Sequence, residues 1–235
     1  MDNVKTSTIQ PEDFGPVYAE TDLARFPVEP WSVFSNLIFL LIVIYWAFRT
    51  KLNYRHYPLI TIAVPLIFIG FCGGELYHAF RNYRLWLLLD YLPILFLALT
   101  GCVYFWQLIY KNIFLTFISS LLPLFLYRIF TIFVLLPDAI YISLGYAALA
   151  LNVMFPTLLY CILKNRKNCF SLFLGAIFFA VAVLFRQMDF DYGKTIVPVG
   201  THFLWHIFGG ISVFFFMRYI YSVENMNIEA PIPKV

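Results

Sequence analysis

The sequence predicts an all-α integral membrane protein that folds as a bundle of seven transmembrane helices. Hydrophobic residues make up 62% of the 235-residue chain and charged residues only 12%, whereas about a quarter of the residues in soluble domains are charged. The apolar residues also form blocks of about 17 to 26, which is the length that a helix rising about 1.5 Å per residue needs to cross a hydrocarbon core of about 30 Å. Both observations argue against an ordinary soluble domain.

Seven apolar blocks occur along the chain, and each is expected to form one span. They cover residues 32–48, 58–80, 86–110, 112–135, 139–163, 169–188 and 198–222. The connections are short, so residues 1–235 are expected to form a single domain with a polar N-terminal segment (1–31) and a C-terminal tail (223–235). The N-terminal segment is acidic and lacks the basic start of a cleaved signal peptide, so the first span is expected to insert uncleaved.

The basic residues of the connections predict the orientation of the chain. The N-terminal side holds Lys5, Arg25, Arg81, Arg84 and Lys194, and the opposite side holds Arg49, Lys51, Arg55, Lys111, Lys164, Arg166, Lys167, Arg218 and Lys234. Lysine and arginine accumulate on the cytoplasmic side of membranes. The N-terminus is therefore expected outside or in a lumen and the C-terminus in the cytoplasm. These charges form no nucleic-acid patch, and the sequence leaves the oligomeric state open.

The four cysteines are expected to pack inside the bundle. Cys72, Cys102, Cys161 and Cys169 lie in or at the ends of different spans, and no two of them form a C-x-x-C pair. This spacing favours neither a disulfide framework nor a thiolate metal site.

Polar side chains that are costly in lipid occur in most of the spans. In chain order they are Glu29 and Asn36 at the start of the first span, Glu75 and His78 at the end of the second, Asp90 near the start of the third, Arg128 in the fourth, Arg186 and Asp189 at the end of the sixth, and His202 and His206 at the start of the last. Residues three or four apart share one face of a helix, so Glu75 is expected on the same face as His78, and His202 on the same face as His206.

Consecutive spans alternate in direction, so the ends of even spans and the starts of odd spans lie on the same side. His78, His202, His206 and Asp90 are therefore expected at one depth on the N-terminal side. Three neutral imidazoles with an open fourth position are the ligand set of a catalytic zinc, and Asp90 would hold the activated water or orient a histidine. The alternative is a polar network that only locks the helices together.

Four motifs lie around these residues: Glu-Pro-Trp-Ser-Val-Phe-Ser-Asn at 29–36, Gly-Gly-Glu-Leu-Tyr-His-Ala at 73–79, Leu-Asp-Tyr-Leu-Pro at 89–93 and Gly-Thr-His-Phe-Leu-Trp-His at 200–206. In order and spacing they resemble motifs of the CREST superfamily of seven-span membrane hydrolases, and within it the alkaline ceramidases. The resemblance implies zinc on His78, His202 and His206, Asp90 acting on the water that zinc activates, and hydrolysis of an amide bond in a membrane lipid.

The chain departs from that family at two places. Gly74 stands where the family has a serine four residues before the first histidine, which removes a hydroxyl expected to steady the water or the oxyanion. The family's calcium site also lies before the glutamate that Glu29 matches, and of its acidic positions only Glu29 and Glu20 remain here. Calcium binding, and ceramide as the substrate, are therefore doubtful.

Two polar residues have several possible roles. Glu75 is expected to take over part of the missing serine's task as a general base, to become a fourth zinc ligand, or to act as the counter-ion of Arg128 or Arg186. Arg128 is expected to pair with Glu75, with Asp90 or with a lipid head group, or else to snorkel to the interface.

Another class of protein remains as an alternative. Receptors of the adiponectin-receptor type share a three-histidine zinc layer without robust hydrolysis, but their N-terminus lies inside the cell. A retinal-binding pump is disfavoured because the last span contains no lysine, and a transporter is disfavoured because the chain shows no repeated halves.

Overall fold

The structure is a computed structural model that describes residues 10–164 and 168–229. It is all-α, as predicted, and each of its seven helices is long and apolar enough to cross a membrane. The helices are α1 (Pro30–Thr50), α2 (Pro58–Phe80), α3 (Arg84–Tyr110), α4 (Ile113–Phe133), α5 (Asp138–Leu163), α6 (Cys169–Ile196) and α7 (His202–Glu229). Four of the basic residues used to predict orientation, Lys5, Arg166, Lys167 and Lys234, lie outside the described residues.

The largest boundary errors of the sequence prediction lie around the α6–α7 connection. α6 continues to Ile196 instead of ending at 188, and α7 begins at His202 instead of 198. Proline cannot donate to a preceding turn and disfavours helix at the residue before it, so the helix stops at Val197, which is extended, just before Pro198. His202 is consequently the first residue of α7.

The C-terminal end of α7 was also predicted too short. Residues 223–229 belong to the helix rather than to a polar tail, and 230–235 lie outside the described part of the chain. Val223 and Glu224 are buried, and the Glu224 carboxylate accepts a hydrogen bond of 2.7 Å from the backbone amide of Leu59 at the start of α2. Contacts with neighbouring helices thus extend α7 beyond its apolar stretch.

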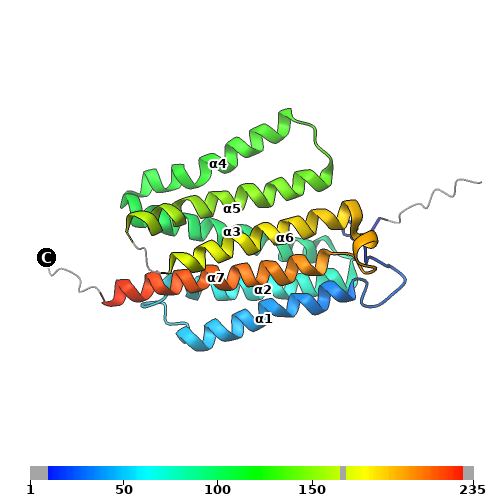
Figure 1. Cartoon of the computed structure of the whole chain (residues 1–235), viewed down its shortest axis with the longest axis horizontal. Coiled ribbons are helices and arrows are strands. Elements are labelled where there is room, and N and C mark those ends of the chain that lie inside the picture. Colours follow the sequence, from blue (N-terminus) through cyan, green and yellow to red (C-terminus); the bar gives the residue numbers. More distant parts are fainter. Residues whose placement is uncertain (1–9, 165–167, 230–235) are drawn as a thin grey trace, which may run out of the picture.

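Six helices form a closed ring in the order α1, α2, α3, α5, α6, α7, and α4 packs outside it against α3 and α5 (Figure 1). The described part of the N-terminal segment (residues 10–29) covers one end of this ring, where α2 and α6 end and α1, α3, α5 and α7 begin. α7 ends at the opposite end of the bundle (Figure 1). The predicted alternation of directions is therefore present.

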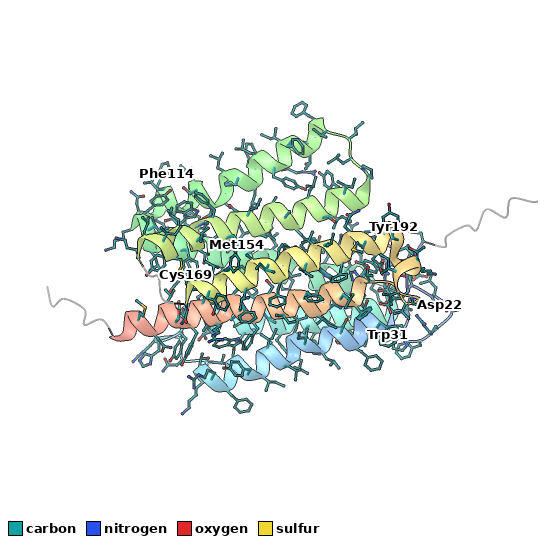
Figure 2. All side chains as sticks on the ribbon, viewed as in Figure 1. Asp22, Trp31, Phe114, Met154, Cys169 and Tyr192 are labelled. Carbon is teal, nitrogen blue, oxygen red and sulfur yellow. A yellow bond between two sulfur atoms is a disulfide. The ribbon has the colours of Figure 1, made fainter. Side chains whose placement is uncertain are left out.

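The interior between the helices is filled by two apolar clusters, one around Trp46, Ile60 and Met217 and the other around Phe105 and Tyr219. Many large apolar side chains instead face outward, as Figure 2 shows for Phe114 on α4. Such an outer surface suits hydrocarbon rather than water, because large exposed apolar surfaces are rare on soluble monomers.

The prediction that all four cysteines serve only packing was wrong. Cys161 at the end of α5 and Cys169 at the start of α6 form a disulfide, with 6.2 Å between their Cα atoms. The sequence reading failed because the short connection turns the chain back and brings the two helix ends together. Cys72 and Cys102 are free.

Candidate metal centre

Three histidines meet at the covered end of the bundle. His78 comes from the last turn of α2, and His202 and His206 come from the first two turns of α7. One ring nitrogen of each lies within 4.8 Å of those of the other two, and all three side chains are buried. The sequence prediction that these residues share one depth is confirmed, and the arrangement can hold a metal ion.

Hydrogen bonds fix the ring of His78 for this task. Its Nδ1 lies 2.6 Å from Oε2 of Glu29, and because an ionised carboxylate only accepts, Nδ1 carries the proton. The lone pair is then on Nε2, which is buried and has no hydrogen-bond partner among the described residues. A buried imidazole nitrogen without a partner is unusual, and a metal ion would satisfy it.

Hydrogen-bonding groups of α1 orient the ring of His206 in the same way. Its Nδ1 lies 3.1 Å from the backbone carbonyl oxygen of Ser32 and 3.0 Å from the hydroxyl of Ser35. A carbonyl oxygen can only accept, so Nδ1 donates and Nε2 keeps the lone pair. Carbonyl or carboxylate partners on the far ring nitrogen are typical of metal-binding histidines.

His202 is positioned by its ring and by its backbone. Tyr18 stacks on its imidazole with 3.5 Å between ring centroids, and its Nδ1 is a second buried nitrogen without a partner in the described part of the chain. Asp189 on α6 accepts hydrogen bonds from the backbone amides of Thr201 and His202. This carboxylate therefore caps α7 and fixes where the helix presents its first ligand.

The turn before His202 needs a glycine. Gly200 has φ +83°, and a Cβ atom at this position would collide with Oδ1 of Asp189. Only glycine adopts such a φ without strain. The same carboxylate also accepts a hydrogen bond of 2.9 Å from the amide of Ala19, so the turn and the N-terminal segment are tied to one side chain.

A buried ionic network that the sequence analysis missed lies behind His78. Glu29 is fully buried, and besides His78 its carboxylate accepts from the hydroxyl of Thr21 and from Nη1 of Arg81. Arg81 also binds Asp13 through two hydrogen bonds, Nε to Oδ2 at 2.7 Å and Nη2 to Oδ1 at 3.1 Å. Arg81 looked like an ordinary loop charge because nothing in the sequence shows that Asp13 folds back onto it.

Three acidic residues before α1 bind groups of the protein itself. The carboxylate of Glu20 accepts from the amides of Trp31 at 2.9 Å and Ser32 at 3.0 Å and from the Ser32 hydroxyl, and so caps α1. The carboxylates of Asp13 and Glu29 are bound to the Arg81 guanidinium. The cation at this place is therefore a side chain of the protein.

Asp90 lies against the helical turn that precedes His78. A Cβ atom at Gly74 would lie 2.8 Å from Oδ1 of Asp90 and 2.9 Å from Nδ2 of Asn36, and Gly74 is one helical turn before His78. The absence of a side chain at Gly74 lets these two polar groups approach α2. Asp90 is not among the clustered donor atoms, which suits the predicted role beside the metal rather than on it.

Glu75 does not reach the histidine cluster. Its carboxylate accepts a hydrogen bond of 3.3 Å from Asn36 and is not one of the donor atoms that come together. Among the described residues it also forms no ion pair, so the predicted pairings with Arg128 and Arg186 are not present. The space left by the missing serine is taken by Asn36 and Asp90 rather than by Glu75.

Arg128 lies away from the site. It is exposed on α4, the helix outside the ring, and donates a hydrogen bond of 3.0 Å to the hydroxyl of Tyr141. The predicted pairing with Glu75 or Asp90 was wrong, because no local pattern indicates that α4 lies at the edge of the bundle. Arg186 on α6, by contrast, is buried.

Neither the comparison with models of known protein families nor the search of curated proteins gives a match for this chain. What the fold and the site define is therefore a class: a seven-helix membrane protein with a buried three-histidine cluster under an N-terminal cover.

Replacing Arg81 by methionine is expected to destabilise the protein by about 3 to 5 kcal/mol, because Asp13 and Glu29 would be left buried without their counter-charge. Thermal unfolding of the purified protein in detergent measures this loss. Arg84→Met is the matched control, since Arg84 is exposed at the same end of the bundle. Equal unfolding temperatures for the two variants would show that the network does not support the fold.

Proposed function

We propose that this protein is a zinc-dependent hydrolase that cleaves an amide bond in a membrane lipid. The observation that carries the proposal is the cluster of three buried histidines, in which His78 Nε2 and His202 Nδ1 have no hydrogen-bond partner among the described residues. Three imidazole nitrogens are a common ligand set of catalytic zinc, which leaves a position open. Zinc in such a site polarises a carbonyl group and makes a nucleophile available from water near neutral pH.

Hydrogen bonds from the chain itself orient the rings of His78 and His206. The Glu29 carboxylate accepts a hydrogen bond from Nδ1–H of His78, and the Ser32 carbonyl oxygen accepts one from Nδ1–H of His206. Metal binding requires the unprotonated nitrogen of a neutral ring. Fixing the proton on Nδ1 therefore prepares Nε2 as the ligand atom in both residues.

Asp90 is the residue to which we assign the proton transfer. It is an acid near the start of α3, placed against the glycine one turn before His78, and it is not used as a ligand. A carboxylate in this position would take the proton of the attacking water and deliver it to the amine that leaves. Asn36 lies beside the same glycine and donates a hydrogen bond to Glu75.

Gly74 is the observation that favours the other candidate function, a zinc-containing receptor or lipid-binding protein without robust hydrolysis. A serine hydroxyl at this position would stand next to Asp90, and the glycine supplies no donor for a developing oxyanion. The two candidates differ in turnover but not in metal content.

For orientation we propose an N-terminus outside or in a lumen and a cytoplasmic C-terminus, on the basis of the basic residues in the connections. One feature points the other way. The Cys161–Cys169 disulfide lies at the end of the bundle opposite the histidines, and disulfides persist mainly in oxidising compartments. The orientation follows the basic residues rather than the disulfide, because the basic residues are spread over several connections.

The purified protein is expected to contain one zinc ion per chain, and His206→Ala is expected to lose it because two imidazoles remain. Elemental analysis after gel filtration gives the stoichiometry. His56→Ala is the matched control, since His56 is exposed in the loop between α1 and α2. Stoichiometric zinc in a His202→Ala/His206→Ala double variant would refute the assignment of the ligands.

Asp90→Asn is expected to lower the turnover of N-acyl lipids by about 100-fold or more, the range that general acid–base groups contribute, while zinc is retained. Hydrolysis of a panel of N-acyl lipids by mass spectrometry, with zinc measured on the same samples, tests this. Glu75→Gln should lose much less, because Glu75 lies outside the cluster. A wild-type protein that holds zinc and cleaves none of the panel would favour the receptor-type function instead.

If the C-terminal side faces the cytoplasm, the Cys161–Cys169 disulfide is expected to be reduced in intact cells and to form once the protein is purified in air, because cytosolic reductants keep such pairs open. Acid quenching followed by differential alkylation and peptide mass spectrometry reports their state, with the free Cys72 as internal reference. Recovery of the intact disulfide from quenched cells would reverse the proposed orientation.

A further inference from the structure

Arg186 is a buried cation that forms no ion pair with the side chains that the structure describes. It lies in the membrane-spanning part of α6 with only 2% of its surface exposed. Within the described residues, ion pairs with nitrogen–oxygen distances up to 4.0 Å involve His78, Arg81, Asp13 and Glu29, and none involves Arg186. Its hydrogen bond is a long one, 3.4 Å from Nη1 to the hydroxyl of Ser143. A guanidinium has five N–H donors, and leaving a charge in such a place unpaired is costly.

Aromatic rings compensate part of this cost. The guanidinium carbon lies 5.2 Å from the ring centroid of Tyr146 and 5.2 Å from that of Phe190. Cation–π contacts of this kind are favourable, but a ring does not accept the N–H groups as a carboxylate does. Asp90 does not come within ion-pair distance of the guanidinium. The environment therefore tolerates the charge and does not neutralise it.

The same rings connect Arg186 to the histidine cluster. Phe190 packs against Tyr18 at 5.8 Å between centroids, and Tyr18 stacks on His202. On the other side, Tyr146 packs at 5.0 Å against Trp205, the residue before His206. α6 carries Arg186 and α7 carries His202 and His206, and these two helices lie side by side along the bundle (Figure 1). Two successive aromatic rings thus connect Arg186 to the candidate metal centre on each side, Phe190 and Tyr18 on one and Tyr146 and Trp205 on the other.

We propose that Arg186 binds the carboxylate of an acyl lipid, so that the preferred substrate is an N-acyl amino acid rather than a neutral N-acyl lipid. A carboxylate on the amine side of the amide would give the guanidinium the acceptor that the described residues do not supply. Arginine and carboxylate form two parallel hydrogen bonds in this pairing. That an N-acyl amino acid is the substrate rests on the proposed hydrolase function, whereas the binding of a carboxylate by Arg186 does not.

The test compares N-oleoylglycine with N-oleoylethanolamine, which share an acyl chain and an amide and differ in the terminal carboxylate. Binding to the purified protein is measured by calorimetry in detergent, first with zinc and then after chelation, because a carboxylate could also bind the metal. The zinc-free wild type is expected to bind N-oleoylglycine about 10- to 100-fold more tightly, the range for a hydrogen bond to a charged group.

Variants assign this preference to Arg186. Arg186→Gln is expected to abolish it, and Arg186→Lys to retain part of it, because lysine keeps the charge and loses the planar fork. Arg128→Gln is the matched control, since it removes an arginine that lies on α4 outside the ring. Equal affinity of the zinc-free wild type for the two lipids overturns the proposal without any variant, and so does a preference that survives in a folded Arg186→Gln protein.

Hydrolysis of the same pair separates this inference from the proposed function. Cleavage of both lipids at equal rates, without a binding preference, would support the hydrolase and overturn the role of Arg186. A preference for N-oleoylglycine that depends on Arg186, with neither lipid cleaved, would support the carboxylate site and contradict the hydrolase.

Discussion

The Glu29 carboxylate, shared between His78 and Arg81, is the interaction on which the covered end of the bundle depends. One oxygen accepts from Nδ1 of His78 and the other from the guanidinium, and all three side chains are buried. Through Arg81 the pair extends to Asp13, which holds the N-terminal segment over the helix ends. Removing one member of such a group leaves an unmatched charge in a low-dielectric place. The candidate metal centre and its cover are therefore one folding unit.

The two buried arginines at this end differ in how their charge is matched. Arg81 has two carboxylates of the protein as partners, so its charge is used within the fold. Among the described residues, Arg186 contacts aromatic rings and the hydroxyl of Ser143 and forms no ion pair. The difference follows from position, because Arg81 sits at the end of α2 under the acidic N-terminal segment and Arg186 sits among the rings of α5 and α6.

The three histidines could be predicted because their grouping depends on local rules. Helical spacing puts His202 and His206 on one face, and the alternation of spans brings His78 to the same depth. Glu75 obeys the same rules and still points elsewhere, toward Asn36. The partner of a polar side chain depends on which helix lies opposite. Because α4 lies outside the ring, Arg128 likewise donates to the hydroxyl of Tyr141 and not to an acidic side chain.

The sequence by itself determined the seven helices, their alternating directions and the depth of the histidines, because the length and periodicity of apolar stretches fix these features in a membrane. Only the tertiary structure decided that α4 leaves the ring, that Asp13 and Arg81 stand behind His78, and that Asp189 caps α7 while binding Ala19, 170 residues away along the chain. Such contacts join residues far apart in sequence. Their geometry depends on the packing of whole helices, which no local pattern encodes.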